Sequence, residues 1–166
     1  DGDIVIARSF LNWSASLTKK IRPNANYTPA RRMVILMRAL EVYGQMLKLA
    51  KGEAGADVTV ISYDDWFRSA EARAETLHTL GFDEADNSLG DVQPYGNGSS
   101  FQADAASPQD LTPERRWEQM LEDGEYRVFL WVAAQDADFR ADLEAVYPED
   151  AAQLAELAKA APGGTA

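Results

Sequence analysis

Arg8 stands at the end of a short aliphatic run, Ile4 to Ala7, and two serines, Ser14 and Ser16, follow it within eight residues. The run predicts a buried parallel strand, and the residues from Trp13 to Lys20 predict a helix. This arrangement places a guanidinium near hydroxyl and backbone N–H groups. Such groups bind phosphate or sulfate, because arginine donates a bidentate, charge-assisted pair of hydrogen bonds and the helix start adds its dipole. The alternative is that Arg8 is a strand-end charge and both serines are ordinary helix surface.

A second candidate follows the run Val58-Thr59-Val60-Ile61-Ser62-Tyr63, which predicts another strand. In open α/β sheets ligands bind at the carboxyl ends of the strands, so Tyr63 is placed where a ligand would lie. The alternative is a core tyrosine, with Asp64 and Asp65 as a solvated acid pair at a helix start. A metal site at the two aspartates is rejected, since adjacent residues point apart and no third ligand is evident.

The third candidate is Tyr95-Gly96-Asn97-Gly98-Ser99-Ser100-Phe101, inside a polar stretch at residues 83–111. Small residues let the backbone approach an anion closely, and the hydroxyls of Ser99 and Ser100 can donate to it. A loop of this length in a compact domain is usually either functional or disordered. A flexible polar loop without a ligand is the alternative here.

In this order the three segments resemble landmarks of sulfotransferases that use 3′-phosphoadenosine 5′-phosphosulfate (PAPS). Residues 4–16 are similar to the family's strand that ends in arginine, with a serine eight residues later, as Arg8 and Ser16 are spaced here. The pair Asn12-Trp13 is similar to an Asn-aromatic pair in bacterial members. The residues Ser9-Phe10-Leu11 depart from the family, where Asp/Asn-Pro is more usual.

The other two segments match later landmarks. Residues 58–66 are similar to a strand that ends in Tyr-Glu/Asp-Asp, and Gly96 to Phe101 resembles a late glycine-rich loop. The resemblance implies that PAPS is the cofactor and that the enzyme transfers a sulfuryl group to a hydroxyl or amine acceptor. It implies the following cofactor contacts: Arg8 and Ser16 on the 3′-phosphate, Tyr63 on the adenine, and Gly98, Ser99 and Ser100 closing over the phosphate.

The family's N-terminal landmark has no counterpart here. No Gly-rich, Lys-containing loop for the 5′-phosphosulfate occurs in the chain, the usual catalytic base is not found, and the first residue is Asp1 rather than methionine. We therefore expect a C-terminal portion of such an enzyme. Because positioning and electrostatic stabilisation dominate transfers of this kind, these residues alone are expected to bind weakly and to catalyse almost nothing.

The elements that must position these residues follow a crossover order. The first strand and its helix precede a longer helix, which Thr28-Pro29 begins and which ends before Gly52; the second strand and a helix at Ala70–Leu80 follow. This order predicts an α/β fold, with a partial parallel sheet flanked by helices and a helical C-terminal region. We expect one domain over residues 1–161 and a frayed tail at 162–166.

Charge and composition limit the partners. The net charge of −11 argues against a nucleic-acid partner, but residues 1–40 carry seven basic and two acidic residues and the other 126 residues carry −16. An anion site therefore belongs near the N-terminal end. The chain has no cysteine, no signal peptide and no membrane-length apolar run, so we expect a cytoplasmic protein with no membrane span.

The alternative function is an acidic, mainly helical interaction module whose loop at 83–111 binds a protein.

Overall fold

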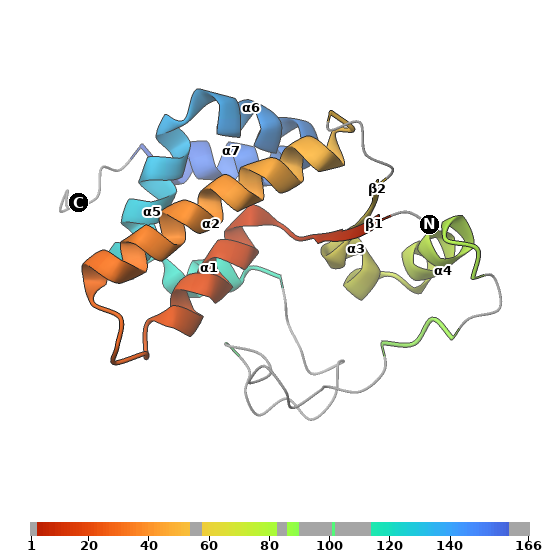
Figure 1. Cartoon of the computed structure of the whole chain (residues 1–166), viewed down its shortest axis with the longest axis horizontal. Coiled ribbons are helices and arrows are strands. Elements are labelled where there is room, and N and C mark those ends of the chain that lie inside the picture. The colour runs from red at the N-terminus through yellow and green to blue at the C-terminus, as the bar shows by residue number, and fades with distance from the viewer. Residues whose placement is uncertain (1–2, 54–57, 83–85, 90–100, 102–113, 160–166) are drawn as a thin grey trace.

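The computed structural model describes residues 3–53, 58–82, 86–89, 101 and 114–159. Its elements run, in chain order, β1 (Asp3–Ala7), α1 (Phe10–Ile21), α2 (Pro29–Ala50), β2 (Val58–Ser62), α3 (Tyr63–Arg68), α4 (Ala70–Thr79), the 3₁₀ helix η3 (Arg116–Met120), α5 (Gly124–Gln135), α6 (Ala137–Val146) and α7 (Pro148–Leu157) (Figure 1). The fold is α/β with a helical C-terminal region, as predicted. The tail at 162–166 and the glycine-rich loop motif up to Ser100 lie outside the described residues.

β1 and β2 form a parallel pair, and in the described part of the chain they are the whole sheet. Asp3 is opposite Val58 and Ala7 is opposite Ser62, with α2 on the crossover between the two strands. The prediction of a buried first strand is wrong. Ile4 and Ile6 are 53% and 67% exposed, because β1 packs mainly against β2 and α2, which leaves the isoleucine face open.

Serine and threonine side chains set where the helices begin. Thr28 Oγ1 accepts from the N–H of Arg31 at 3.3 Å, with Pro29 in the first helical position, as predicted. Ser62 Oγ accepts from the N–H of Asp65 at 3.3 Å and so starts α3. Tyr63 is therefore the first residue of that helix rather than the last of the strand.

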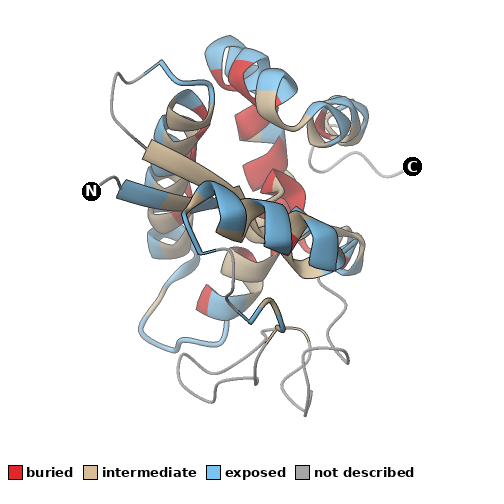
Figure 2. Ribbon diagram, turned by 90° about the vertical axis from the view of Figure 1, so that its right-hand side faces the viewer, coloured by how far each residue is buried: buried red, intermediate tan, exposed pale blue. Residues whose placement is uncertain are grey.

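The hydrophobic core lies among the long helices. Phe10 is fully buried, and its ring centroid lies 5.0 Å from that of Phe139 and 5.2 Å from that of Tyr43. The face of α2 that the spacing predicts is buried at Leu36, Leu40, Tyr43 and Leu47. In Figure 2 the buried residues gather between the helices, whereas β1 near the N-terminus is mostly exposed. None of the described helices is both long and apolar enough to cross a membrane.

Candidate functional site

Arg8 and Tyr63 meet at one edge of the sheet. Because Ala7 is opposite Ser62 in the parallel register, the next residue of each chain segment leaves the sheet at the same carboxyl end. The Cζ atom of Arg8 lies 5.0 Å from the centre of the Tyr63 ring, within the range of a cation–π contact. Two residues 55 positions apart in the sequence are thereby brought together where α/β folds bind ligands.

The backbone at Arg8 is fixed to the core. The hydroxyl of Tyr43, on α2, donates to the carbonyl oxygen of Arg8 at 2.5 Å. Tyr43 is buried, and burial raises the pKa of its phenol above the ordinary value, so this hydroxyl keeps its proton at neutral pH. The strand end is therefore anchored to the face of α2 that packs against Phe10.

Ser16 lies on α1, two turns after the start of the helix. Its Oγ atom is buried and makes no hydrogen bond within the described residues. A buried hydroxyl without a partner is costly, so such an atom in a folded protein points to an interaction that the described residues do not supply. Asn12, Ser16 and Lys19 follow one another at steps of four and three, which places them on one side of α1.

η3 brings Arg116 to this side of α1. The backbone N–H of Arg116 donates to Asn12 Oδ1 at 2.8 Å, and the residue is only 5% exposed. Its pKa is lowered from the ordinary value, first by burial and then by the positive charge of Arg8. The positive charge of Arg8 therefore acts on the Arg116 guanidinium. An anion that binds beside both arginines would favour the charged form of Arg116, and so would oppose the lowering of its pKa by burial and by Arg8.

The residue before Arg116 has an unusual backbone. Arg115 adopts a φ of 56°, the left-handed region that non-glycine residues rarely occupy. Such a conformation costs on the order of 1 kcal/mol and tends to persist at functional positions. Here it stands immediately ahead of the buried arginine, at the turn that leads into η3.

Phe101 completes the arrangement. Lys19 Nζ lies 3.9 Å from the centre of its ring, and Arg116 Cζ lies 5.7 Å from it. Gly98, Ser99 and Ser100 lie outside the described residues, but Phe101, the last residue of the predicted loop motif, contacts two cations of the site. We call Arg8, Lys19 and Arg116, with Tyr63 and Phe101, the cation cluster.

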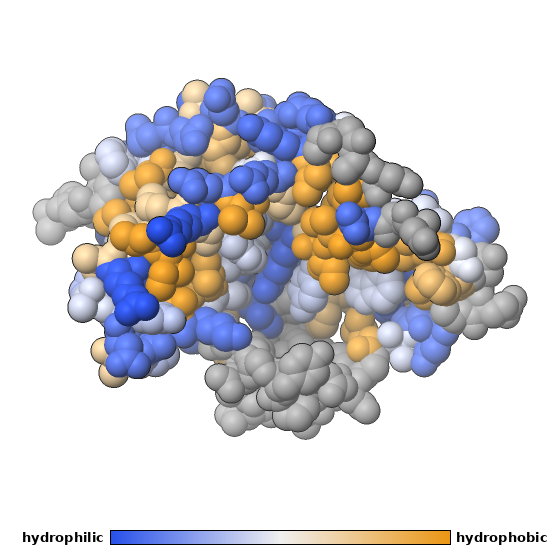
Figure 3. Space-filling view, in the orientation of Figure 1, coloured by the Kyte–Doolittle hydropathy of each residue, from blue (hydrophilic) through white to orange (hydrophobic). Residues whose placement is uncertain are grey.

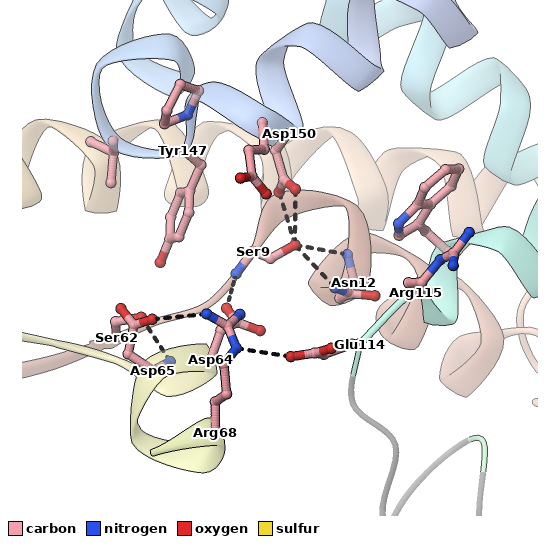
Figure 4. A pocket seen from close by; sticks show the side chains of 14 residues that line it. Ser9, Asn12, Ser62, Asp64, Asp65, Arg68, Glu114, Arg115, Tyr147 and Asp150 are labelled. Carbon is pink, nitrogen blue, oxygen red and sulfur yellow. Dashed lines mark hydrogen bonds and ion pairs between the residues drawn. The ribbon is translucent and has the colours of Figure 1, made fainter. Parts of the chain in front are cut away.

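The start of α1 is occupied by the chain's own carboxylates, so the predicted role of the helix dipole is wrong. Asp64 Oδ2 accepts from the N–H of Ser9 at 2.6 Å. Asp150, on α7, accepts from Ser9 Oγ at 2.9 Å (Figure 4) and also from the N–H of Leu11 at 3.1 Å. Because a helix N-terminus attracts negative charge, these two carboxylates satisfy it internally. An anion at the cation cluster would be held by side chains instead.

A polar pocket of about 440 Å³ lies beside the start of α1 (Figure 4). Its walls include the carboxylates Asp64, Asp65 and Asp150 and the ring of Tyr147. Burial raises the pKa of Asp150 above its usual range. Asn12 lines this pocket and also holds the backbone of Arg116, so the pocket and the cation cluster adjoin.

Lys19 and Arg116 are the site residues that reasoning from the sequence missed. The spacing of Lys19, three residues after Ser16 on the same helix, is a signal that could have pointed to it. Arg116 belongs to an Arg-Arg pair in the otherwise acidic remainder of the chain, a weaker signal. Its place beside Arg8 depends on the packing of η3 against α1, which no local pattern shows.

No known protein family matches the chain, and neither a curated protein nor a solved structure shows significant similarity to it. The functional interpretation therefore depends on the geometry of the site and on the motif resemblance.

Proposed function

We propose that this chain binds the 3′-phosphoadenosine end of PAPS, as part of a sulfotransferase that transfers a sulfuryl group to a hydroxyl or amine acceptor. The observation that supports the proposal most is the convergence of Arg8, Tyr63 and Arg116 beside the helix that carries the unsatisfied Ser16 hydroxyl. These residues come from four separate elements or their ends. Together they offer the groups that a phosphorylated nucleotide needs.

The donor set fits a phosphate. Arg8 and Arg116 would hold the 3′-phosphate from two sides, because a guanidinium matches the geometry of phosphate oxygens and keeps its charge when buried. Ser16 Oγ would donate one further hydrogen bond to the same group. The ring of Tyr63, next to Arg8, would lie against the adenine.

When bound, PAPS supplies the sulfuryl group that is transferred. The residues of this chain then bind and orient the nucleotide. Charge-assisted hydrogen bonds fix one end of it, and Tyr43 holds the backbone from which Arg8 projects. The carboxylates of the adjacent pocket repel an anion, so the phosphate is expected on the cation side of Asn12.

The test is a melting experiment with two nucleotides. Adenosine 3′,5′-bisphosphate is expected to raise the melting temperature of the protein, whereas 5′-AMP, which lacks the 3′-phosphate, is expected to leave it nearly unchanged. Equal shifts with both nucleotides would show that the 3′-phosphate is not recognised. The absence of any shift would favour the alternative, a protein-interaction module.

Calorimetric titration of two variants assigns the effect to Arg8. Arg8→Ala is expected to weaken binding of the bisphosphate by about ten- to a hundredfold, because a charged hydrogen-bonded contact contributes about 1.5–3 kcal/mol. The control is Arg38→Ala, which removes the same charge from an exposed position on α2. If both variants lose the same affinity for the bisphosphate, the loss of one positive charge alone explains the effect of Arg8→Ala. That result would contradict a direct contact between Arg8 and the 3′-phosphate.

A further inference from the structure

The outer edge of β1 is open in the described part of the chain. β1 pairs with β2 along one side, and none of the other described residues forms a strand along its second side. Ile4 and Ile6 point to the same face of the sheet, and both are more than half exposed. Figure 3 shows hydrophobic side chains gathered over this sheet. An exposed aliphatic edge strand is a template for pairing with another chain, and parallel sheets are normally buried.

The sequence of β1 is complementary to itself. If two copies pair antiparallel about Val5, all five residues from Asp3 to Ala7 overlap. Each Ile4 then lies directly opposite Ile6 of the second copy, and the twofold axis repeats this pair. Aliphatic β-branched pairs of this kind stabilise antiparallel strands. A twofold interface uses the same surface of both subunits, so that surface must be self-complementary. The edge of β1 meets this requirement.

We propose that two copies of this chain associate through the outer edges of β1. The paired strands form one four-stranded sheet in the order β2–β1–β1–β2, in which the two central strands are antiparallel. Arg8 follows the last paired residue, so the two cation clusters lie at opposite ends of the joined sheet. The proposal does not depend on the nucleotide-binding function.

Sedimentation velocity across a range of protein concentrations tests the association. The protein is expected to form a dimer, and Ile6→Lys is expected to weaken it at least about tenfold, because the change removes an isoleucine pair on both sides of the axis. Val42→Lys is the control: Val42 is 62% exposed on α2, close to the 67% of Ile6. Both variants make the same change to the net charge of −11, so charge cannot account for a difference between them.

A purely monomeric protein at every concentration would overturn the proposal. A dimer that survives Ile6→Lys, or that Val42→Lys weakens equally, would also overturn it.

Single cysteines test the register, since the chain has no cysteine of its own. Val5→Cys lies opposite its own copy, about 4.5–5.5 Å away between Cα atoms, which suits a disulfide. Asp3→Cys lies opposite Ala7, so its own copy is about 13 Å away. Mild oxidation is expected to cross-link the first variant rapidly and the second slowly. The reverse order, or equal rates, would rule out pairing about Val5.

Discussion

Arg116 and Lys19 add two positive charges to the surroundings of Arg8, and they differ in burial. Arg116 is almost fully buried, whereas Lys19 is half-buried on α1. A buried charge interacts more strongly with a bound anion, because water screens it less. The two side chains should therefore contribute unequally to nucleotide binding.

Arg116→Gln is expected to weaken binding of adenosine 3′,5′-bisphosphate by about tenfold or more, and Lys19→Gln by about two- to fivefold. Arg115→Gln is the matched control, since its side chain is 77% exposed and pairs with Glu118. Calorimetric titration measures all three. If Arg115→Gln weakens binding as much as Arg116→Gln does, the cation cluster is not the phosphate site.

Tyr43 and Tyr126 offer a second comparison between single residues. Both are buried, and each donates its hydroxyl hydrogen to a backbone oxygen: Tyr43 to Arg8 at 2.5 Å and Tyr126 to Leu11 at 2.9 Å. Tyr43→Phe and Tyr126→Phe are each expected to lower the free energy of unfolding by about 1–2 kcal/mol in urea titrations. Only Tyr43→Phe is expected to weaken nucleotide binding, by a few fold, because only Tyr43 positions Arg8. Unchanged affinity in Tyr43→Phe would contradict that positioning role.

Among the elements, α7 contacts the start of α1 through the partly buried carboxyl group of Asp150. Asp150 has a raised pKa, because burial disfavours its charged form more than the hydrogen bonds from α1 favour it. In the pH window between the usual aspartate pKa and the raised one, the folded protein binds a proton that the unfolded chain does not. The free energy of unfolding should therefore fall as the pH rises through this window.

Asp150→Asn is expected to remove this part of the pH dependence, because the amide oxygen still accepts hydrogen bonds but does not titrate. Glu149→Gln, an exposed neighbour on the same helix, should leave the dependence as it is in the wild type. Urea titrations between about pH 4 and pH 7 measure the difference. A wild-type stability that instead rises through this window relative to Asp150→Asn would contradict the raised pKa.

Much of the element order could be predicted from the sequence. Thr28-Pro29, Ser69 and Gly81 mark helix ends by their side-chain and backbone preferences, and the structure has helix ends there. The start of α1 was less predictable. The sequence predicts a helix from Trp13, but the helix begins at Phe10, because Ser9 caps it directly after the strand. An apolar run alone cannot show at which residue the strand ends and the helix begins.

The candidate site was only partly predictable for a related reason. Arg8 and Tyr63 each follow a strand, and parallel crossover topology brings such positions to one edge. Arg116 reaches this edge through a hydrogen bond to Asn12, 104 residues away in the sequence. No propensity or spacing encodes a contact of that range, because it depends on how the helices pack.

At the scale of the whole molecule, stability should be distributed unevenly. The buried hydrophobic cluster draws on α1, α2 and α5 to α7, and no described residue of β2, α3 or α4 belongs to it. α3 has no buried residue, and the only one in α4 is Arg73. Hydrogen exchange followed by mass spectrometry is expected to show faster exchange in α3 and α4 than in α1, α2 and α5. Equal protection of α4 and α2 would contradict a core confined to the long helices.

The candidate site lies at the border between these two regions. Lys19 lies on α1, Arg116 begins η3 and Arg8 joins β1 to α1, whereas Tyr63 begins α3. A nucleotide that bridges them would tie α3 to the core. It is therefore expected to slow exchange in α3 more than in α2.

The most direct test of nucleotide recognition compares two isomers, adenosine 3′,5′-bisphosphate and adenosine 2′,5′-bisphosphate, by calorimetric titration of the wild-type protein. The two carry the same charge and the same base, and they differ only in which ribose oxygen bears the second phosphate. If Arg8, Ser16 and Arg116 form a site shaped for the 3′-phosphate, the 3′,5′ isomer should bind at least about tenfold more tightly. Equal affinity for the two isomers would show that the cation cluster attracts anions without recognising this nucleotide.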